Sequence, residues 1–163
     1  MRTKMLKFLL MVSLLNVVLV GCEKKDNRTI NQIYINQFAY DAYLFEVYKV
    51  DLENKEFSVH HADVFISFTI PVQGRDYTLV KSLADDKIEE FRKEARNLSF
   101  TSWKESYEND KILDGGAWEI TIVLSNGDIV LTTGFNAFPK NWDAMKEAFK
   151  LLLEEDILWS SYK

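Results

Sequence analysis

Apolar and polar residues alternate most regularly in segments 118–124 and 129–135, on either side of Asn126 and Gly127. Successive side chains of a strand point to opposite faces, so this alternation predicts two strands with one apolar face each. An Asn-Gly pair between such strands is the strongest short signal for a hairpin, because both turn residues tolerate positive φ. With those two residues as the loop, the apolar faces of both strands coincide. The predicted facing pairs are Leu124–Ile129, Ile122–Leu131, Ile120–Thr133 and Trp118–Phe135.

Shorter alternating runs predict further strands upstream of this hairpin. They are expected at residues 30–38, 43–50, 57–61, 64–70 and 77–83. The second and third should form a hairpin across residues 51–55, and the last two are joined through Pro71 and Gly74. We expect the first strand, 30–38, at an edge of the sheet.

Two other segments carry apolar residues at spacings of three and four, which is the period of an α-helix. The first, 85–97, begins with two aspartates, where the helix dipole favours negative charge. The second, 141–155, runs into acidic residues that the dipole disfavours at a C-terminus, so we expect it to end near Glu154. The apolar faces consist of Ile88, Phe91, Ala95 and Leu98 in the first helix and of Trp142, Met145, Phe149 and Leu152 in the second.

The order of these elements is strands, hairpin, helix, hairpin, helix. An antiparallel sheet buries one apolar face, and two amphipathic helices can cover it. The sequence therefore predicts the α+β class, with a single antiparallel sheet and both helices packed on one face. Residues 30–163 are expected to form this one globular domain.

The N-terminus has the features of a secretory signal. Three positive residues within positions 2–7 precede the apolar run 8–20, which has 13 residues. A helix needs roughly 20 apolar residues to cross a bilayer, so this run is too short for a conventional membrane span. A charged start followed by a short apolar centre is typical of a signal peptide instead.

The signal ends in Leu19-Val20-Gly21-Cys22, which resembles the lipobox of bacterial lipoproteins. The resemblance implies that the Cys22 thiol carries diacylglycerol and that the signal is cut between Gly21 and Cys22. It divides the chain into a signal peptide (1–21), a polar tether (22–29) and the globular domain. The alternatives are a structural cysteine beside an ordinary cleavage site, or an N-terminal anchor helix. Cys22 is the only cysteine, so no internal disulfide and no multi-cysteine zinc site is possible.

Cleavage changes the charge of the protein. It removes Arg2, Lys4 and Lys7 and no acid, so 20 positive side chains become 17 against 25 negative ones, a net charge of −8. A nucleic-acid-binding protein would normally show a basic face, so no nucleic-acid partner is expected. We expect the protein to be lipid-anchored in the cell membrane or the outer membrane, on the extracytoplasmic side. Its membrane contact is then the lipid on Cys22.

Candidate catalytic and metal-binding residues are few. His60 and His61 are the only histidines, and adjacent strand residues point to opposite faces, so the pair is not expected to bind one metal. The sequence contains no Gly-x-Ser-x-Gly, no His-Glu-x-x-His and no P-loop. We therefore assign no catalytic residue, no metal site and no cofactor.

A second resemblance lies in the C-terminal half. The pattern Asp114-Gly115-Gly116-x-Trp118 followed by Gly134-x-Asn136-x-x-Pro139-x-Asn141-Trp142 resembles uncharacterised domains of bacterial lipoproteins. It implies no activity. Locally, its glycines, asparagines and proline suit turns, a strand bend and the approach to a helix.

Two functional hypotheses follow. The first is a tethered, non-catalytic module that binds a protein or another envelope component; the second is a small envelope hydrolase. Trp159 and Tyr162, in the apolar tail beyond the last helix, are candidate partner contacts, because exposed aromatic anchors often dominate interfaces. The alternative for this tail is that it folds back and that Trp159 fills the core.

Overall fold

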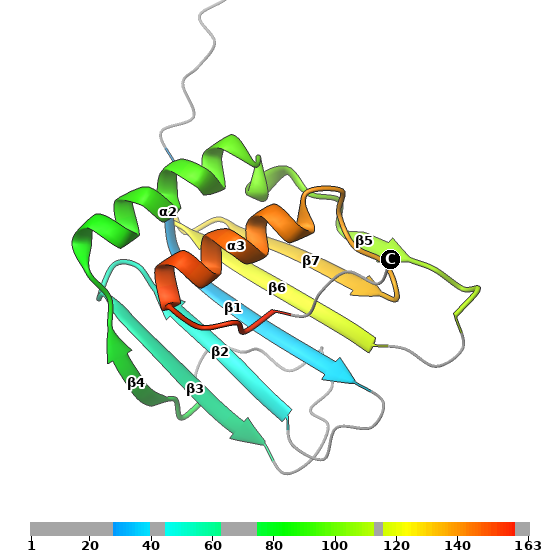
Figure 1. The fold of residues 1–163 in the computed structure, drawn as a ribbon, viewed down its shortest axis with the longest axis horizontal. Helices are drawn as coiled ribbons and strands as arrows, with labels where there is room; N and C mark the ends of the chain where they lie inside the picture. Colours follow the sequence, from blue (N-terminus) through cyan, green and yellow to red (C-terminus); the bar gives the residue numbers. More distant parts are fainter. Residues whose placement is uncertain (1–27, 40–44, 63–74, 113–115, 159–163) are drawn as a thin grey trace, which may run out of the picture.

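The computed structural model describes residues 28–39, 45–62, 75–112 and 116–158 of the 163-residue chain. These residues form one sheet and two main helices (Figure 1). The strands are β1 (Ile30–Ala39), β2 (Phe45–Asp51), β3 (Glu56–Ala62), β4 (Thr78–Ser82), β5 (Ser106–Glu108), β6 (Gly116–Leu124) and β7 (Ile129–Phe135). The helices are α2 (Asp85–Asn97), the 3₁₀ turn η1 (Phe100–Ser102) and α3 (Trp142–Leu153).

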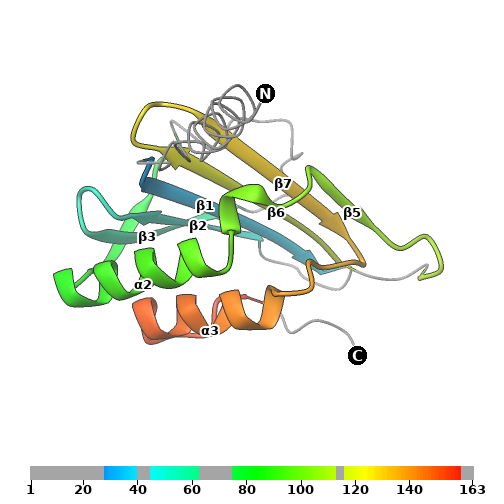
Figure 2. The ribbon, with the colours of Figure 1, turned by 90° about the horizontal axis from the view of Figure 1, so that it is seen from above.

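The α+β class is confirmed. Seven strands form one sheet in the order β4-β3-β2-β1-β6-β7-β5, and every neighbouring pair is antiparallel except β5 and β7. Figures 1 and 2 show α2 and α3 side by side on the same face of this sheet. The rings of Phe91 and Phe149 join the two helices, with their centroids 4.9 Å apart.

The position of the first strand differs from the prediction. β1 lies at the centre of the sheet, between β2 and β6, and not at an edge. Ile33 and Ile35 are fully buried beneath the helices, and Tyr34 on the opposite face is also buried. One of its two neighbours, β6, is distant in sequence, and Ile33 of β1 lies opposite Ile122 of β6. A local pattern contains no information about a pairing over such a separation, so the edge prediction was wrong.

Both helices begin and end close to the predicted residues. The first spans residues 85–97 as expected, and the second ends at Leu153, where Glu154 adopts the left-handed conformation with φ 55°. This conformation closes the helix at the point where the acidic run begins. After the helix the chain folds back onto the domain, and the side chains of Ile157 and Leu158 are buried in the core.

The predicted register of the β6–β7 hairpin is wrong by one residue. The loop has three residues, 125–127, since the Leu124 amide donates to the Asp128 carbonyl at 2.9 Å. Within this loop, Gly127 alone has positive φ (85°). A two-residue turn of the expected type needs positive φ at both Asn126 and Gly127. The Asn126 side chain instead accepts a hydrogen bond from the Asp128 amide at 3.1 Å. Trp118 therefore lies opposite Gly134 and not opposite Phe135.

A one-residue shift turns every side chain of β7 to the other face. Thr132 and Gly134 now face the helices, while Ile129, Leu131 and Phe135 face away from them. The three-residue loop thus leaves Ile129, Leu131 and Phe135 outside the core, whereas the predicted register had placed them in it.

The residues of the second resemblance have structural roles. The indole rings of Trp118 and Trp142 pack with centroids 4.6 Å apart, and the Trp118 Nε1 donates to the Ala137 carbonyl at 2.9 Å. The buried side chain of Asn136 accepts from the Gly116 amide and donates to the Ile112 carbonyl, each at 3.0 Å. These contacts attach the end of β7 to the start of β6.

Several predictions lie outside the described residues. They include the strand at 64–70, the signal peptide with Gly21 and Cys22, and the candidate contacts Trp159 and Tyr162.

Candidate functional site

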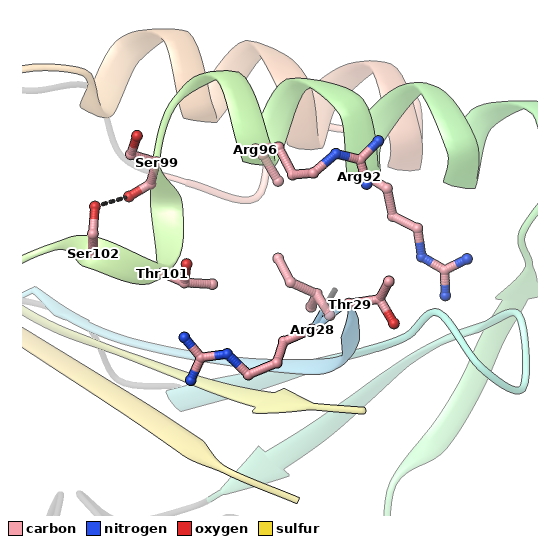
Figure 3. A pocket seen from close by; sticks show the side chains of 9 residues that line it. Arg28, Thr29, Arg92, Arg96, Ser99, Thr101 and Ser102 are labelled. Carbon is pink, nitrogen blue, oxygen red and sulfur yellow. Dashed lines mark hydrogen bonds between the residues drawn. The ribbon is translucent and has the colours of Figure 1, made fainter. Parts of the chain in front are cut away.

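A cavity of about 300 Å³ lies between α2, η1 and the start of β1. The described residues that line it are Arg28, Thr29, Ile30, Arg92, Ala95, Arg96, Ser99, Thr101 and Ser102. Three of these residues are arginines, four carry side-chain hydroxyls, and none is acidic. In Figure 3, α2 forms the upper wall, the start of β1 lies below, and the three residues 99, 101 and 102 close one side. We call this cavity the arginine pocket.

The three arginines have different partners. Arg28 forms an ion pair with Asp128 at 3.2 Å, and Arg92 forms one with Glu89 at 2.9 Å. The buried Nε atom of Arg92 has no hydrogen-bond acceptor within the part of the chain that the structure describes. Arg96 lies in the last turn of α2 and forms no ion pair among the described residues. The described lining of the pocket thus carries three guanidinium groups and no carboxylate.

The pocket lies at residues 28 and 29, the end of the predicted tether. The Thr29 amide donates to the Ser125 hydroxyl at 3.1 Å, and the Ser125 amide donates to the Thr29 carbonyl at 2.8 Å. Together with the Arg28–Asp128 pair, these bonds hold the first described residues against the β6–β7 turn. The predicted lipid site, Cys22, precedes Arg28 by only six residues.

A row of apolar side chains runs along β7 on the face away from the helices. Ile129 is 57% exposed, Leu131 47% and Phe135 45%. A hollow of about 270 Å³ beside Phe135 extends this surface over Ala117 and Gly134. We call the three side chains the β7 row. Large apolar side chains that are exposed on one face of a strand are a feature of contact sites.

The centre of the same face contains a buried carboxyl group. Glu119 lies opposite Asn36 of β1 and is only 5% exposed. Burial raises the pKa of Glu119 to about 7, although the positive charge of Arg75 acts in the opposite direction. Beside β1, the ring of Tyr77 packs against Tyr34 with a centroid distance of 6.0 Å.

A second buried acid has a structural role. Asp51 is fully buried and accepts hydrogen bonds from the Asn54 amide at 2.9 Å and from Gln32 at 2.8 Å. Lys49 pairs with it at 3.0 Å. Burial by itself would raise the pKa of Asp51, but the hydrogen bonds from Asn54 and the charge and hydrogen bond of Lys49 lower it below its usual value. Asp51 thus closes the turn between β2 and β3 as an ionised group.

The two histidines have separate environments. His60 Nδ1 lies 2.9 Å from the Asp76 carbonyl, and His61 Nδ1 lies 3.4 Å from Glu46. No group of three or more histidine, cysteine or acidic side chains that could hold a metal occurs among the described residues.

Sequence reasoning did not find the arginine pocket or the environment of Glu119. The three arginines come from the tether and from one helix, and their convergence depends on how α2 packs over β1. Glu119 lies on the polar face of the alternating segment 118–124, a position that predicts exposure. A signal was present in the spacing of Arg92 and Arg96, four residues apart on one helix face.

Within the described residues, no helix has the length and hydrophobicity needed to cross a membrane. The comparisons add no relative. No protein-family model, no curated protein and no solved structure matches this chain.

Proposed function

We propose that this protein is a lipid-anchored, extracytoplasmic lipoprotein whose folded domain acts by binding and not by catalysis. The lipobox at residues 19–22 supports the anchor. The observation that carries the binding function is the β7 row, three large apolar side chains that are each about half exposed. Its occupant in this proposal is an apolar surface of a partner protein in the envelope.

The tether supports this arrangement. Arg28 follows Cys22 by six positions, and an extended chain spans at most about 3.4 Å per residue, so the domain lies within about 20 Å of its anchor. The mature charge of −8 gives the domain no general attraction to anionic lipid. The lipid on Cys22 therefore provides the attachment, and two or three acyl chains hold a protein stably where a single chain holds it only marginally.

The anchor can be tested by replacing Cys22 with serine. A serine hydroxyl does not form the thioether, so labelling with a radioactive fatty acid should be lost and the uncleaved precursor should accumulate. The measurement is lipid labelling together with the molecular mass of the protein in cell fractions. Ser13→Ala, within the apolar run, is the control and should be processed normally. If wild-type protein is soluble without detergent to the same extent as Cys22→Ser, the lipoprotein proposal is wrong.

The contact surface can be tested with a photoreactive amino acid at Leu131. In intact cells this position should crosslink to one defined species, and Ile129→Ser with Phe135→Ser should remove the crosslink. Leu151 on α3 is a matched control, because it is an equally exposed leucine (51%) on the helical side of the domain. Identical crosslinks from both positions would mean that the β7 row is not a specific contact site.

One observation favours the hydrolase as a second candidate. A carboxyl group with a pKa near 7, such as that of Glu119, suits general acid–base catalysis at neutral pH. Its 5% exposure leaves little access for a substrate, so we favour binding. Loss of an envelope-degrading activity in Glu119→Gln, with the fold intact, would reverse this preference.

A further inference from the structure

We propose that the arginine pocket binds a phosphate ester. The pocket combines guanidinium groups with side-chain hydroxyls, which are the donors that proteins use to bind phosphate oxygens. A cavity of about 300 Å³ has room for about ten water molecules at roughly 30 Å³ each, which is enough for a phosphate with a small alcohol attached.

The charge distribution supports a ligand of this sign. The mature chain has a net charge of −8, yet three positive and no negative described side chains line the pocket. Arg28 pairs with Asp128 and Arg92 with Glu89, whereas Arg96 forms no ion pair among the described residues. An anion in the pocket would supply a partner for Arg96.

The buried Nε of Arg92 is the second, independent observation. A buried donor without an acceptor is costly, so native structures rarely retain one without a reason. The atom is shielded from solvent, so a phosphate oxygen can accept from it once the guanidinium turns its Nε toward the cavity. By contrast, the C-terminal dipole of α2 favours arginine at position 96 even without a ligand, so Arg96 alone would not support the proposal.

The arrangement in Figure 3 gives the shape of the ligand. Arg96 runs along α2 toward Arg92, while the Arg28 guanidinium lies at the opposite end, on the side of Thr101 and Ser102. A phosphate held by the two α2 arginines therefore leaves the other end for a hydroxyl-bearing substituent. A glycerol phosphate, free or as a lipid headgroup, has these two parts.

The position of the pocket favours the lipid source. Arg28 lies within about 20 Å of a lipidated Cys22, so the phosphates of the same membrane are within reach. This source depends on the proposed anchor, whereas phosphate binding by the pocket does not.

The test uses the full-chain protein in detergent with glycerol 1-phosphate as the probe. Sodium chloride keeps the ionic strength constant, so that screening does not contribute. We expect the melting temperature to rise with the logarithm of the probe concentration above the Kd, as for a ligand that binds only the folded state. Arg96→Gln and Arg92→Lys should weaken the apparent affinity at least tenfold, since charge-assisted hydrogen bonds or their bidentate geometry are lost. The lysine variant keeps the charge beside Glu89, which protects the fold.

Lys93→Gln is the matched control, because Lys93 is an exposed cation on the same helix but does not line the pocket. It should keep the wild-type affinity. If the melting temperature does not rise with the probe, or if Lys93→Gln loses as much affinity as Arg96→Gln, the phosphate proposal is wrong.

A second arm distinguishes the source. The protein is placed in nanodiscs of phosphatidylcholine, with or without phosphatidylglycerol. If the lipid headgroup occupies the pocket, phosphatidylglycerol raises the melting temperature and glycerol 1-phosphate adds nothing further. If the soluble probe still stabilises the protein equally in both discs, the ligand is a free phosphate ester. Failure of the anchor would show as protein without lipid, and the first arm would still test the pocket.

Discussion

Replacement of Gly134 by alanine is expected to destabilise the domain by about 3 kcal/mol or more, because the core has no room for the added methyl group. Gly134 lies directly opposite Trp118 in the β6–β7 ladder. A Cβ atom at this position would overlap the indole ring. The indole cannot move aside, since it is buried against Trp142 and its Nε1 is bonded to the Ala137 carbonyl. Thermal and urea unfolding of the purified protein would measure the effect.

Gly127→Ala is the matched control for this substitution. Gly127 has positive φ (85°), but no atom lies within 4 Å of a Cβ atom placed there. Its replacement should therefore cost only the backbone strain, about 1 kcal/mol. In addition, Trp118→Leu should partly rescue Gly134→Ala in the double variant, because the smaller side chain leaves space for the methyl group. Equal stability of the two single alanine variants would contradict the observed register.

Replacement of Glu119 by glutamine is expected to stabilise the domain at pH 8 by about 3 kcal/mol and to remove a pH dependence of its stability. Burial raises the pKa of this carboxyl from 4.5 to about 7 in the folded protein. Each tenfold change in an ionisation constant corresponds to about 1.4 kcal/mol, from which the expected magnitude follows. Glutamine has nearly the same shape and carries no charge to desolvate.

The direction of the pH dependence follows from proton binding. Between about pH 4.5 and 7 the folded protein holds a proton on Glu119 that the unfolded chain has lost, so stability falls as the pH rises. The contribution is complete below pH 4.5 and absent above pH 7. Urea unfolding of the wild type and of Glu119→Gln from pH 4.5 to 8 measures the difference. Glu90→Gln, on the exposed side of α2, should leave the curve unchanged. Parallel curves for the wild type and Glu119→Gln would show that folding does not raise the pKa of this carboxyl.

The sequence alone predicted the elements whose pattern is local. The helical period in residues 85–97 and 141–155 arises because each helix must present one apolar face, whatever its neighbours are. The acidic run after Leu153 predicted where the second helix ends, for an electrostatic reason that also acts within a few residues. The lipobox is also a local pattern, because it is a continuous stretch of four residues. It stays a prediction for experiment.

Only the tertiary structure decided how these elements combine. Ile33 pairs with Ile122 across β1 and β6, and no pattern within either strand specifies that partner. The hairpin register depended on whether Asn126 and Gly127 both take positive φ or Gly127 alone does, and the second case placed the β7 row on the surface. Arg28, Arg92 and Arg96 form one pocket because α2 packs over the start of β1. Periodicity determines which face a residue is on, whereas contacts between distant segments determine what that face meets.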